Sequence, residues 1–312
     1  MHINPDFIGF GAVTVDDFIH LTHFPEQESK VKIEAKYRYG GGLAGNALVA
    51  AARLGTNPAY FGVLGDDELS EFVIDAFHKH GVQTHLCLYE QHAEPTHATI
   101  LVDKTSGSRT VLYQNRYFQL PPISSITSDK FADCSMIFID SASLPIIDHV
   151  LALAHSLEIP VLADIENKSI TQHQKSLDAI DHLILNIKTA QEITGEQNPN
   201  SILRALETSK RKVGVITAGA EGCWFKVTGN PIFHMPAFPI KAVDTTGCGD
   251  VFHGAYAAAL LRGSKIFQAV IQASAAAGMK ATRPGGRAGI PTLSQLEQFI
   301  KSHEEIQPEL ID

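Results

Sequence analysis

Short apolar segments recur along the chain, and a segment with helical character follows most of them. Short apolar runs that are bounded by turn residues suit strands buried on both faces, which is typical of a parallel sheet covered by helices. Strands that alternate with helices favour the α/β class, with a doubly wound, mostly parallel sheet and helices on both faces. The expected strands are residues 6–13, 59–64, 136–139, 160–163, 182–185 and 213–217.

Helices are expected between and after these strands. Asp66 is the expected N-cap of a helix that continues to His80 and stops at Gly81. Neither an internal repeat nor a low-complexity linker interrupts the pattern, so residues 1–312 are expected to form a single domain. The other expected helices are residues 43–54, 145–157, 188–194, 201–209, 251–261 and 266–281.

Two regions depart from this rhythm, because polar and apolar residues alternate in them. They are residues 30–39 and 97–103, and a turn signal at 105–108 leads into the β-prone run 109–113. Alternation of this kind predicts strands of a small, half-exposed sheet. We expect these strands as insertions at about residues 14–40 and 96–118.

Composition excludes several classes of function. The formal net charge of −9 argues against nucleic acid or an acidic membrane as a partner. The chain lacks a run of about 18 uninterrupted apolar residues, and we expect a cytoplasmic protein. The four cysteines are scattered, which suggests neither disulfides nor a zinc site. His78 and His80 would face different sides of one helix, so the fifteen histidines do not predict a metal site.

Residues 244–250 read DTTGCGD and run directly into the apolar segment 251–261. Glycines two positions apart let the backbone approach a ligand closely, and a helix start offers unpaired N–H groups to a phosphate. Asp250 lies in the first turn, where a carboxylate can accept the proton of a hydroxyl that attacks a phosphoryl group. The alternative is an acidic residue that only stabilises the helix dipole.

A second glycine run at residues 39–55, YGGGLAGNALVAAARLG, leads into another apolar helix. Together with residues 244–250 it resembles the two signatures of the ribokinase-like (PfkB) family of carbohydrate kinases. Residues 217–222, TAGAEG, are similar to the nucleotide loop of that family, and residues 282–291, TRPGGRAGIP, to its C-terminal loop. The resemblance covers almost the whole chain.

Within the family, the run DVFHG at residues 250–254 and the C-terminal loop look most like the sulfofructose kinase branch. Residues 108–110 and 164–166 are similar to ketohexokinase. The resemblance implies an ATP- and Mg²⁺-dependent kinase that transfers the γ-phosphoryl group to a primary hydroxyl of a small sugar or sugar derivative.

The catalytic residues that the resemblance implies are Asp250, Gly247, Cys248 and Gly249. Asp250 would be the base, and the backbone N–H groups of the other three would face the charge on the transferred group. Cys248 stands where the family usually has alanine. A small buried apolar side chain is the alternative to a reactive thiol at this position.

The implied substrate-binding residues are Asp16, Gly41, Gly42, Asn46 and Arg109. Asp16 follows the first strand, at the edge where parallel sheets place ligands, although the adjacent Asp17 competes for this role. The amide of Asn46 can donate to and accept from sugar hydroxyls, and its alternative partner is the helix backbone. Arg109 and Lys30 are equally consistent with exposed residues of the small sheet.

The implied nucleotide-binding residues are Asn186, Thr217, Gly219 and Gly222. Thr189 replaces the glutamate of the family's Asn-x-x-Glu motif, so the usual water-mediated contact to magnesium is not implied at this position. Asp164 and Glu166 are candidates for part of that role, and the helix at 266–281 is expected to flank the adenine.

Asp244 and Thr246, with carbonyl groups near Ala281 and Gly286, match the family's loop for a monovalent cation such as K⁺. The alternative is that Asp244 only stabilises the turn before the helix.

Other functions are consistent with parts of the sequence. Related family members phosphorylate nucleosides, and Thr189 also motivates a catalytically weak regulator that binds a sugar or nucleotide. A dinucleotide-dependent dehydrogenase is disfavoured, because Gly9 and Gly11 lack the third glycine of the fingerprint. In the family, strands like those at 14–40 and 96–118 form a lid over the substrate and often a dimer contact, which implies a homodimer through the lid.

Overall fold

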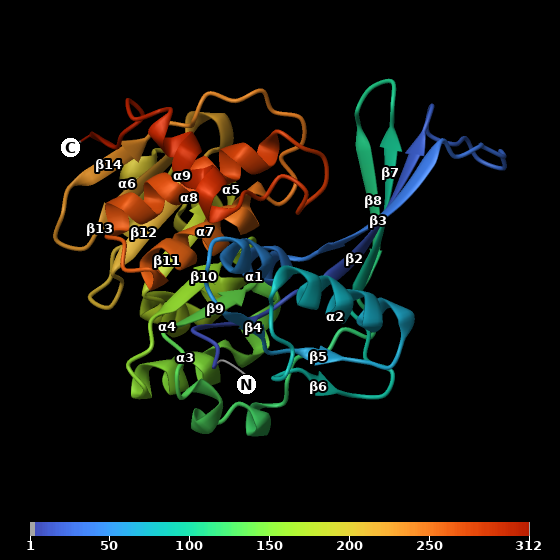
Figure 1. Ribbon diagram of the computed structural model, residues 1–312. Helices are drawn as coiled ribbons and strands as arrows, with labels where there is room; N and C mark the ends of the chain where they lie inside the picture. Colours follow the sequence, from blue (N-terminus) through green and yellow to red (C-terminus); the bar gives the residue numbers. More distant parts are fainter. Residues whose placement is uncertain (1–3, 312) are drawn as a thin grey trace.

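A computed structural model describes residues 4–311 of the chain. Its centre is a nine-stranded sheet with the order β15-β14-β13-β12-β11-β10-β9-β1-β4 (Figure 1). From β4 to β12 the neighbouring strands are parallel, as the sequence predicts. These strands are β4 (Pro58–Tyr60), β1 (Phe7–Phe10), β9 (Met136–Asp140), β10 (Val161–Asp164), β11 (His182–Asn186) and β12 (Val213–Thr217).

One edge of the sheet is antiparallel, which the sequence analysis did not predict. β13 (Cys223–Val227) pairs with β12, β14 (Ile232–Met235) pairs with β13, and β15 (Glu309–Leu310) follows at the edge. β13 and β14 form a hairpin whose turn includes Gly229 with a φ of 78°. The glycine of this turn is the local signal for the hairpin.

Helices cover both faces of the sheet, which confirms the doubly wound α/β architecture. One core packs α1, α2, α7, α8 and α9 against the sheet, and a second core packs α3, α4, α5 and α6 against the other face. Neighbouring strand residues such as Phe7 and Ile8 belong to different cores, because side chains alternate along a strand. The helices are α1 (Leu43–Arg53), α2 (Glu68–His80), α3 (Ile147–Ser156), α4 (Gln174–Ala179), α5 (Ile187–Thr194), α6 (Pro199–Ala205), α7 (Cys248–Leu261), α8 (Ile266–Ala281) and α9 (Leu293–Lys301).

The start of α2 corrects one prediction. Asp67, rather than Asp66, is the N-cap, because its Oδ1 accepts the N–H groups of Leu69 at 2.8 Å and Ser70 at 3.1 Å. The helix ends as predicted at Gly81, whose φ of 81° is left-handed.

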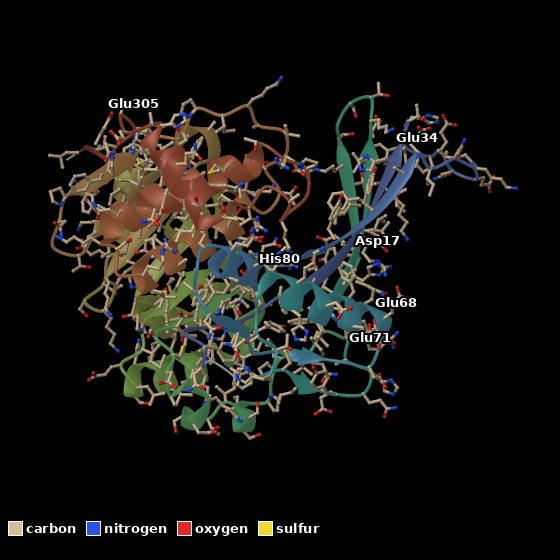
Figure 2. The ribbon with its side chains drawn as sticks, in the orientation of Figure 1. Asp17, Glu34, Glu68, Glu71, His80 and Glu305 are labelled. Atoms are coloured by element: carbon tan, nitrogen blue, oxygen red, sulfur yellow. The ribbon has the colours of Figure 1, made fainter. Side chains whose placement is uncertain are left out.

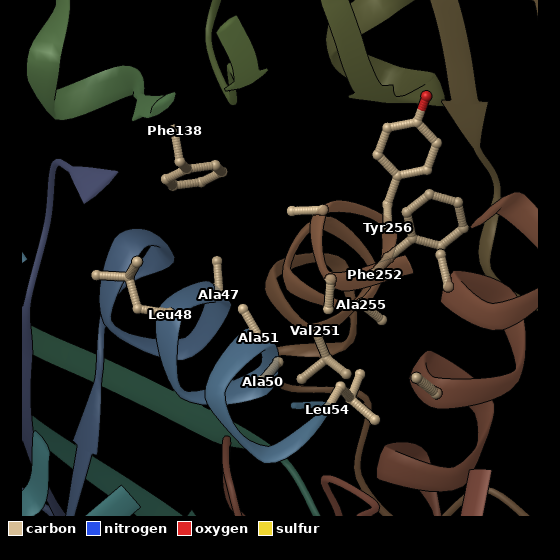
Figure 3. Close-up of a cluster of buried hydrophobic side chains, with 14 of the residues drawn as sticks. Ala47, Leu48, Ala50, Ala51, Leu54, Phe138, Val251, Phe252, Ala255 and Tyr256 are labelled. Carbon is tan, nitrogen blue, oxygen red and sulfur yellow. The ribbon is translucent and has the colours of Figure 1, made fainter. Parts of the chain in front are cut away.

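Helices α1 and α7 pack closely, because small side chains line their contact (Figure 3). Ala47, Ala50 and Ala51 of α1 face Val251 and Ala255 of α7, and all five side chains are fully buried. The close approach of these two helices fixes the relative position of their N-terminal ends.

A separate four-stranded sheet with the order β3-β2-β7-β8 projects from the main body (Figure 1). It consists of β2 (Thr14–Leu21), β3 (Ala35–Gly41), β7 (Thr96–Asp103) and β8 (Arg109–Gln114), close to the segments expected at about residues 14–40 and 96–118. Phe18, Ala98 and Ile100 form its small core. We call this sheet the lid sheet. A short pair, β5 (Val63–Leu64) and β6 (Leu88–Tyr89), lies near its base.

Within residues 4–311, every helix is too short or too polar to cross a membrane.

Candidate active site

The beginnings of α1 and α7 bring the two glycine-rich runs of the sequence together. The side-chain amide of Asn46 donates a hydrogen bond of 2.7 Å to Oδ2 of Asp250, although 204 positions separate the two residues. Asn46 is buried and Asp250 is half-buried at this point. The predicted base and a predicted substrate-binding residue therefore belong to one site.

Arg287 joins the same cluster from the C-terminal loop. Its Nε donates to Oδ1 of Asn46 at 2.8 Å, and its Nη2 donates to the carbonyl oxygen of Gly41 at 3.0 Å. A Cβ atom on Gly40 would lie 2.3 Å from Nη1, so glycine leaves room for the guanidinium. We refer to Gly41, Asn46, Asp250 and Arg287 as the Asn46 cluster. Arg287 was not among the site residues predicted from the sequence, where its signal was a basic residue within a glycine-rich loop.

The N-terminus of α7 has the geometry of an anion site. Gly247 precedes the helix with a φ of 77°, a conformation that favours glycine. The N–H groups of Gly249 and Asp250 lie in the first turn, where a helix offers no acceptor for them. The N–H of Cys248 donates instead to the carbonyl oxygen of Thr245 at 3.1 Å, which corrects its predicted place among the free donors.

The Cys248 side chain is partly buried in the same loop. Burial raises the pKa of its thiol above the usual value. A raised pKa keeps the sulfur protonated at neutral pH, and the thiol is the less reactive form. The side chain therefore favours the interpretation as a small packing residue.

Other acidic groups shape the ionisation of Asp250. Burial raises the pKa of Asp250 to about 8, and the nearby charge of Asp164 acts in the same direction, whereas the hydrogen bond from Asn46 opposes it. Asp164 ends β10 and is itself buried, so its own pKa is also well above the ordinary range. A general base works best when its pKa lies near the working pH. Asp250 is suited to accept a proton at neutral to mildly alkaline pH.

His253 lies one turn after Asp250 and connects α7 to the sheet. Its Nδ1 lies 2.8 Å from the carbonyl oxygen of Gly249 and 3.2 Å from Oδ2 of Asp164. Its Nε2 lies 3.3 Å from the carbonyl oxygen of Ile184. Both ring nitrogens therefore face oxygen atoms, and the imidazole holds α7 against β10 and β11. This role of His253 was not predicted from the sequence.

The adjacent carboxylates Asp16 and Asp17 lie on opposite faces of β2, as expected for neighbours in a strand. Asp17 is only 4% exposed and accepts a hydrogen bond of 2.8 Å from Nε of Arg38. Figure 2 shows Asp17 on the lid sheet above α2, where Arg38 also pairs with Glu68 at 2.6 Å. Asp16 lies beside Gly41, because a Cβ on Gly41 would be 2.3 Å from its Oδ2. Asp16 therefore adjoins the Asn46 cluster, while Asp17 has a structural partner.

Asp140 organises the backbone at the start of α1. It ends β9, is fully buried, and accepts the N–H groups of Ala12 at 2.7 Å and Ala44 at 3.2 Å. Burial raises the pKa of Asp140 to about 6. Gly42 precedes α1 with a φ of 85°, and a Cβ there would lie 2.3 Å from the carbonyl oxygen of Ala12. The sequence signal for Asp140 was an acidic residue directly after a buried strand, at the edge where parallel sheets place their sites.

A pocket of about 470 Å³ lies between the loop at 217–222, α8 and the start of α7. Thr217, Gly219 and Gly222 line it, so three of the four residues predicted to bind nucleotide lie together. Its volume is in the range of small-molecule sites. Because Cys248 and Gly249 also line it, the pocket reaches the anion site at α7.

Asn186 is the fourth predicted nucleotide-binding residue, and it is not among those that line this pocket. Its side chain caps α5 by accepting the N–H of Thr189 at 2.8 Å. The hydroxyl of Thr189 donates to the carbonyl oxygen of Glu166 at 3.1 Å. Asn186 therefore has a structural partner, and its contact with a nucleotide stays a prediction.

Asp244 lies in a dense set of hydrogen bonds before the anion loop. Its Oδ1 accepts from the N–H of Thr246 at 2.9 Å and from the Thr246 hydroxyl at 2.7 Å, and its Oδ2 accepts from the N–H of Gly285 at 2.9 Å. Burial opposes ionisation, but these hydrogen bonds lower the pKa of Asp244 to about 2. Arg109 donates from the lid sheet to Oδ1 of Asp244 at 3.1 Å and also to the Thr246 hydroxyl. The structure thus places Arg109 against this loop rather than in the Asn46 cluster.

Curated relatives of similar sequence are sugar kinases. The ribokinase of Bacillus subtilis (strain 168) is 28% identical over 262 residues, which cover 83% of this chain and 87% of the relative. The 5-dehydro-2-deoxygluconokinase of Clostridium perfringens (strain 13 / Type A) is 24% identical over 328 residues, covering 98% and 96%.

Solved structures share the fold. The Arabidopsis thaliana ribokinase complexed with ribose and ATP matches with a TM-score of 0.83 at 18% identity, over 96% of this chain and 99% of that chain. The ribokinase of Thermotoga maritima matches with a TM-score of 0.82 at 24% identity, over 95% and 99%. The family model described as pfkB family carbohydrate kinase matches residues 10–293. With most of its length matched and both glycine-rich runs in one site, the chain belongs to the PfkB family of carbohydrate kinases.

Proposed function

We propose that this protein transfers the γ-phosphoryl group of ATP to a primary hydroxyl of a small sugar or sugar derivative, with Asp250 as the base. The observation that carries the proposal is the 2.7 Å hydrogen bond between Asn46 and Asp250. It brings the residue expected to bind the acceptor into contact with the residue expected to deprotonate it. The anion site at the start of α7 adjoins both.

The acceptor hydroxyl lies next to Asp250 in this mechanism, and its oxygen attacks the γ-phosphorus as the proton passes to the carboxylate. The free N–H groups at the start of α7 stabilise the negative charge on the transferred group. Asp16 accepts hydrogen bonds from other hydroxyls of the sugar, while Asn46 and Arg287 hold the cluster in place.

The nucleotide lies in the 470 Å³ pocket, with its phosphates directed toward α7. Mg²⁺ usually binds through one or two carboxylates together with substrate phosphates, and it would neutralise phosphate charge here. Glu166, an exposed carboxylate that raises the pKa of Asp250 by its charge, is the protein ligand we propose. Its exposure leaves it accessible to a hydrated ion.

Replacement of the base tests the mechanism. Asp250→Asn keeps the size of the side chain but cannot accept the proton, so turnover should fall by about 100- to 10,000-fold. Affinity for ADP, measured by calorimetry, should stay close to that of the unmodified protein. Near-normal turnover in this variant would show that Asp250 is not the base.

A panel of substrates tests which sugar or nucleoside is the acceptor. The panel contains ribose, fructose, 6-deoxy-6-sulfofructose, 5-dehydro-2-deoxygluconate, adenosine and inosine, and ADP release is coupled to a spectrophotometric assay. Residues 250–254 and 282–291 resemble the sulfofructose kinase branch, and residues 108–110 and 164–166 resemble ketohexokinase, so the panel includes both kinds of acceptor. The acceptor that is turned over with the highest kcat/KM would identify the substrate class. Preferential turnover of adenosine or inosine would assign the protein to the nucleoside kinases.

A catalytically weak regulator is the second candidate, and Thr189 in the place of the family's glutamate is the observation behind it. Such a protein would bind a sugar or nucleotide in a thermal-shift assay without releasing ADP. Turnover with any panel member at an ordinary enzymatic rate would dismiss this candidate.

A further inference from the structure

Lys280 is a buried cation that the proposed mechanism does not use. It lies in the last turn of α8, its exposed fraction is 0%, and its Nζ donates a hydrogen bond of 2.7 Å to the carbonyl oxygen of Asp244. Removing an ammonium group from water is costly unless neighbouring oxygen atoms and negative charge compensate. A lysine at this place therefore needs an electrostatic explanation.

The loop that Lys280 contacts is the one expected to bind a monovalent cation. The family resemblance implies oxygen ligands from Asp244, Thr246 and the carbonyl groups near Ala281 and Gly286. K⁺ would need several of these oxygen atoms to converge on one position.

Donors of the chain already bind the carboxylate and the carbonyl oxygen of Asp244 and the carbonyl oxygen of Ala281. The carboxylate of Asp244 accepts two hydrogen bonds from Thr246 and one from Gly285. The carbonyl oxygen of Ala281 accepts the N–H groups of Val243 at 2.8 Å and Asp244 at 3.0 Å. The carbonyl oxygen of Asp244 accepts from Lys280.

The charges also disfavour an additional cation. Arg109 donates to the carboxylate of Asp244 and Lys280 donates to the carbonyl oxygen of the same residue, so two cationic side chains already contact Asp244. A third positive charge at the same position would meet repulsion from both. The residues present therefore do not fit K⁺.

We propose that the ammonium group of Lys280 takes the place of the monovalent cation, so that the protein works without K⁺. The hydrogen bond to Asp244 ties the end of α8 to the loop that leads into α7, and it places a fixed positive charge behind the anion site. Lys280 acts through the backbone of that loop and is a positioning residue. The catalytic part of this inference rests on the proposed kinase function.

The unmodified protein provides the first test. Its turnover should be equal, within about twofold, in KCl and in tetramethylammonium chloride at the same ionic strength, since the screening of charges is then matched. Its melting temperature should also be the same in the two salts. Crystals soaked in Tl⁺, an anomalous scatterer of similar radius to K⁺, should show no peak at the Asp244 loop.

Removal of the ammonium group provides the second test. Lys280→Ala should lower turnover in tetramethylammonium chloride by about 100-fold, comparable to the loss of one preorganised electrostatic group. KCl should restore most of that loss and raise the melting temperature of this variant, and Tl⁺ should now bind at the loop. Lys280→Met fills the same space without a charge, so KCl should not rescue it. Lys265→Ala, at the exposed start of the same helix, is the matched control and should behave like the unmodified protein.

Three results would overturn the proposal. They are several-fold activation of the unmodified protein by K⁺, full activity of Lys280→Ala without K⁺, or a folded Lys280→Ala that neither recovers in KCl nor binds Tl⁺. If Lys280→Ala does not fold, the Tl⁺ soak and the melting temperatures of the unmodified protein still decide. The Tl⁺ soak and the melting temperatures do not depend on enzymatic activity. They therefore remain informative even if no acceptor in the panel is phosphorylated and the proposed function fails.

Discussion

At the scale of single residues, the ionisation of Asp250 links the structure to a measurable pH dependence. Burial and the neighbouring Asp164 raise the pKa of Asp250 to about 8. A base must be ionised to accept a proton, so a raised pKa makes the active form scarcer at low pH. We expect kcat/KM, which reports the free enzyme, to rise with pH and to level off above about 8.

Asp164→Asn should move this profile. An ionisable carboxyl group at position 164 disfavours ionisation of Asp250, so a neutral amide there should lower the pKa of Asp250 and shift the rising limb of kcat/KM against pH toward lower pH. Asp75→Asn is the matched control, because Asp75 is an exposed residue of α2. An unchanged profile in Asp164→Asn would show that the charge of Asp164 does not set the ionisation of the base.

Asp17 carries a prediction about stability. The hydrogen bonds from Arg38 hold the pKa of Asp17 well below its usual range. A carboxyl group with a folded pKa below its unfolded value stabilises the fold above the unfolded pKa, and this stability is lost as pH falls. Asp17→Asn should therefore destabilise the lid sheet at pH 7 by about 2 kcal/mol, and the difference should shrink below about pH 4.

Hydrogen exchange of the lid strands at pH 7 and below about pH 4 measures this loss of stability, since exchange reports local opening. Backbone amides of β2 and β3 should exchange faster in Asp17→Asn at pH 7 than in the unmodified protein. Equal protection at pH 7 in the two proteins would contradict the role given to the pair of Asp17 and Arg38.

At the scale of elements, the contact between α1 and α7 holds the two halves of the site together. Gly254 lies at this contact, and a Cβ atom there would be 2.1 Å from the carbonyl oxygen of Ala47 and 2.8 Å from the Cβ of Ala50. Any larger side chain must push the helices apart. The same movement would separate Asn46 from Asp250, so stability and turnover are coupled here.

Gly254→Ala should lower the free energy of unfolding by about 1–3 kcal/mol, the usual cost of overpacking, and reduce kcat as well. Denaturant unfolding and steady-state kinetics measure the two effects. Gly278→Ala in α8 is the control for stability, because its Cβ would meet only ordinary contacts at 3.7 Å and 3.8 Å. Alanine favours helix, so the control should be stabilised by up to about 1 kcal/mol. Equal stability of Gly254→Ala and the unmodified protein would refute the close-packing argument.

The elements also show how far sequence reasoning reaches. The parallel strands β1, β9, β10, β11 and β12 were predictable, because burial on both faces leaves continuous apolar runs. The hairpin of β13 and β14 was missed. Its turn is marked by one glycine, and glycine occurs in many other turns of this chain, so Gly229 alone does not indicate a hairpin. The predicted N-cap of α2 was wrong by one residue, because Asp66 and Asp67 are both good N-cap residues and only the hydrogen bonds in the structure distinguish them.

The site was predictable as a set of motifs but not as a set of contacts. Asn46 and Asp250 lay in recognisable runs, yet their hydrogen bond depends on how α1 packs on α7. Arg287 reaches Asn46 across 241 positions of sequence, and no local pattern marks that partner. Lys280 is a charged residue within an apolar helix, and its contact with Asp244 became visible only in the folded chain.

At the scale of the whole molecule, the lid sheet presents an apolar face that residues 4–311 do not cover. Tyr37, Val111 and Tyr113 are 50%, 56% and 69% exposed. Their cross-strand partners are Phe18, Ile100 and Ala98, which form the small core of the sheet, so all these side chains lie on one face. A large exposed apolar face beside an edge strand is typical of an interface.

We expect a second copy of the chain to cover this face, which makes the protein a dimer through the lid sheet. Sedimentation velocity should show a dimer, and Val111→Glu or Tyr113→Glu should convert it to a monomer, because either change buries a charge in an apolar contact. Thr110→Glu is the matched control, since Thr110 pairs with Leu101 on the opposite face of the same strand. A monomeric unmodified protein, or dissociation by Thr110→Glu as strong as by Val111→Glu, would exclude this face as the interface.

Loss of the dimer should also affect binding of the acceptor. Asp16 lies on the same strand as Phe18, which belongs to the proposed interface face, so the KM for the acceptor should rise more than the KM for ATP.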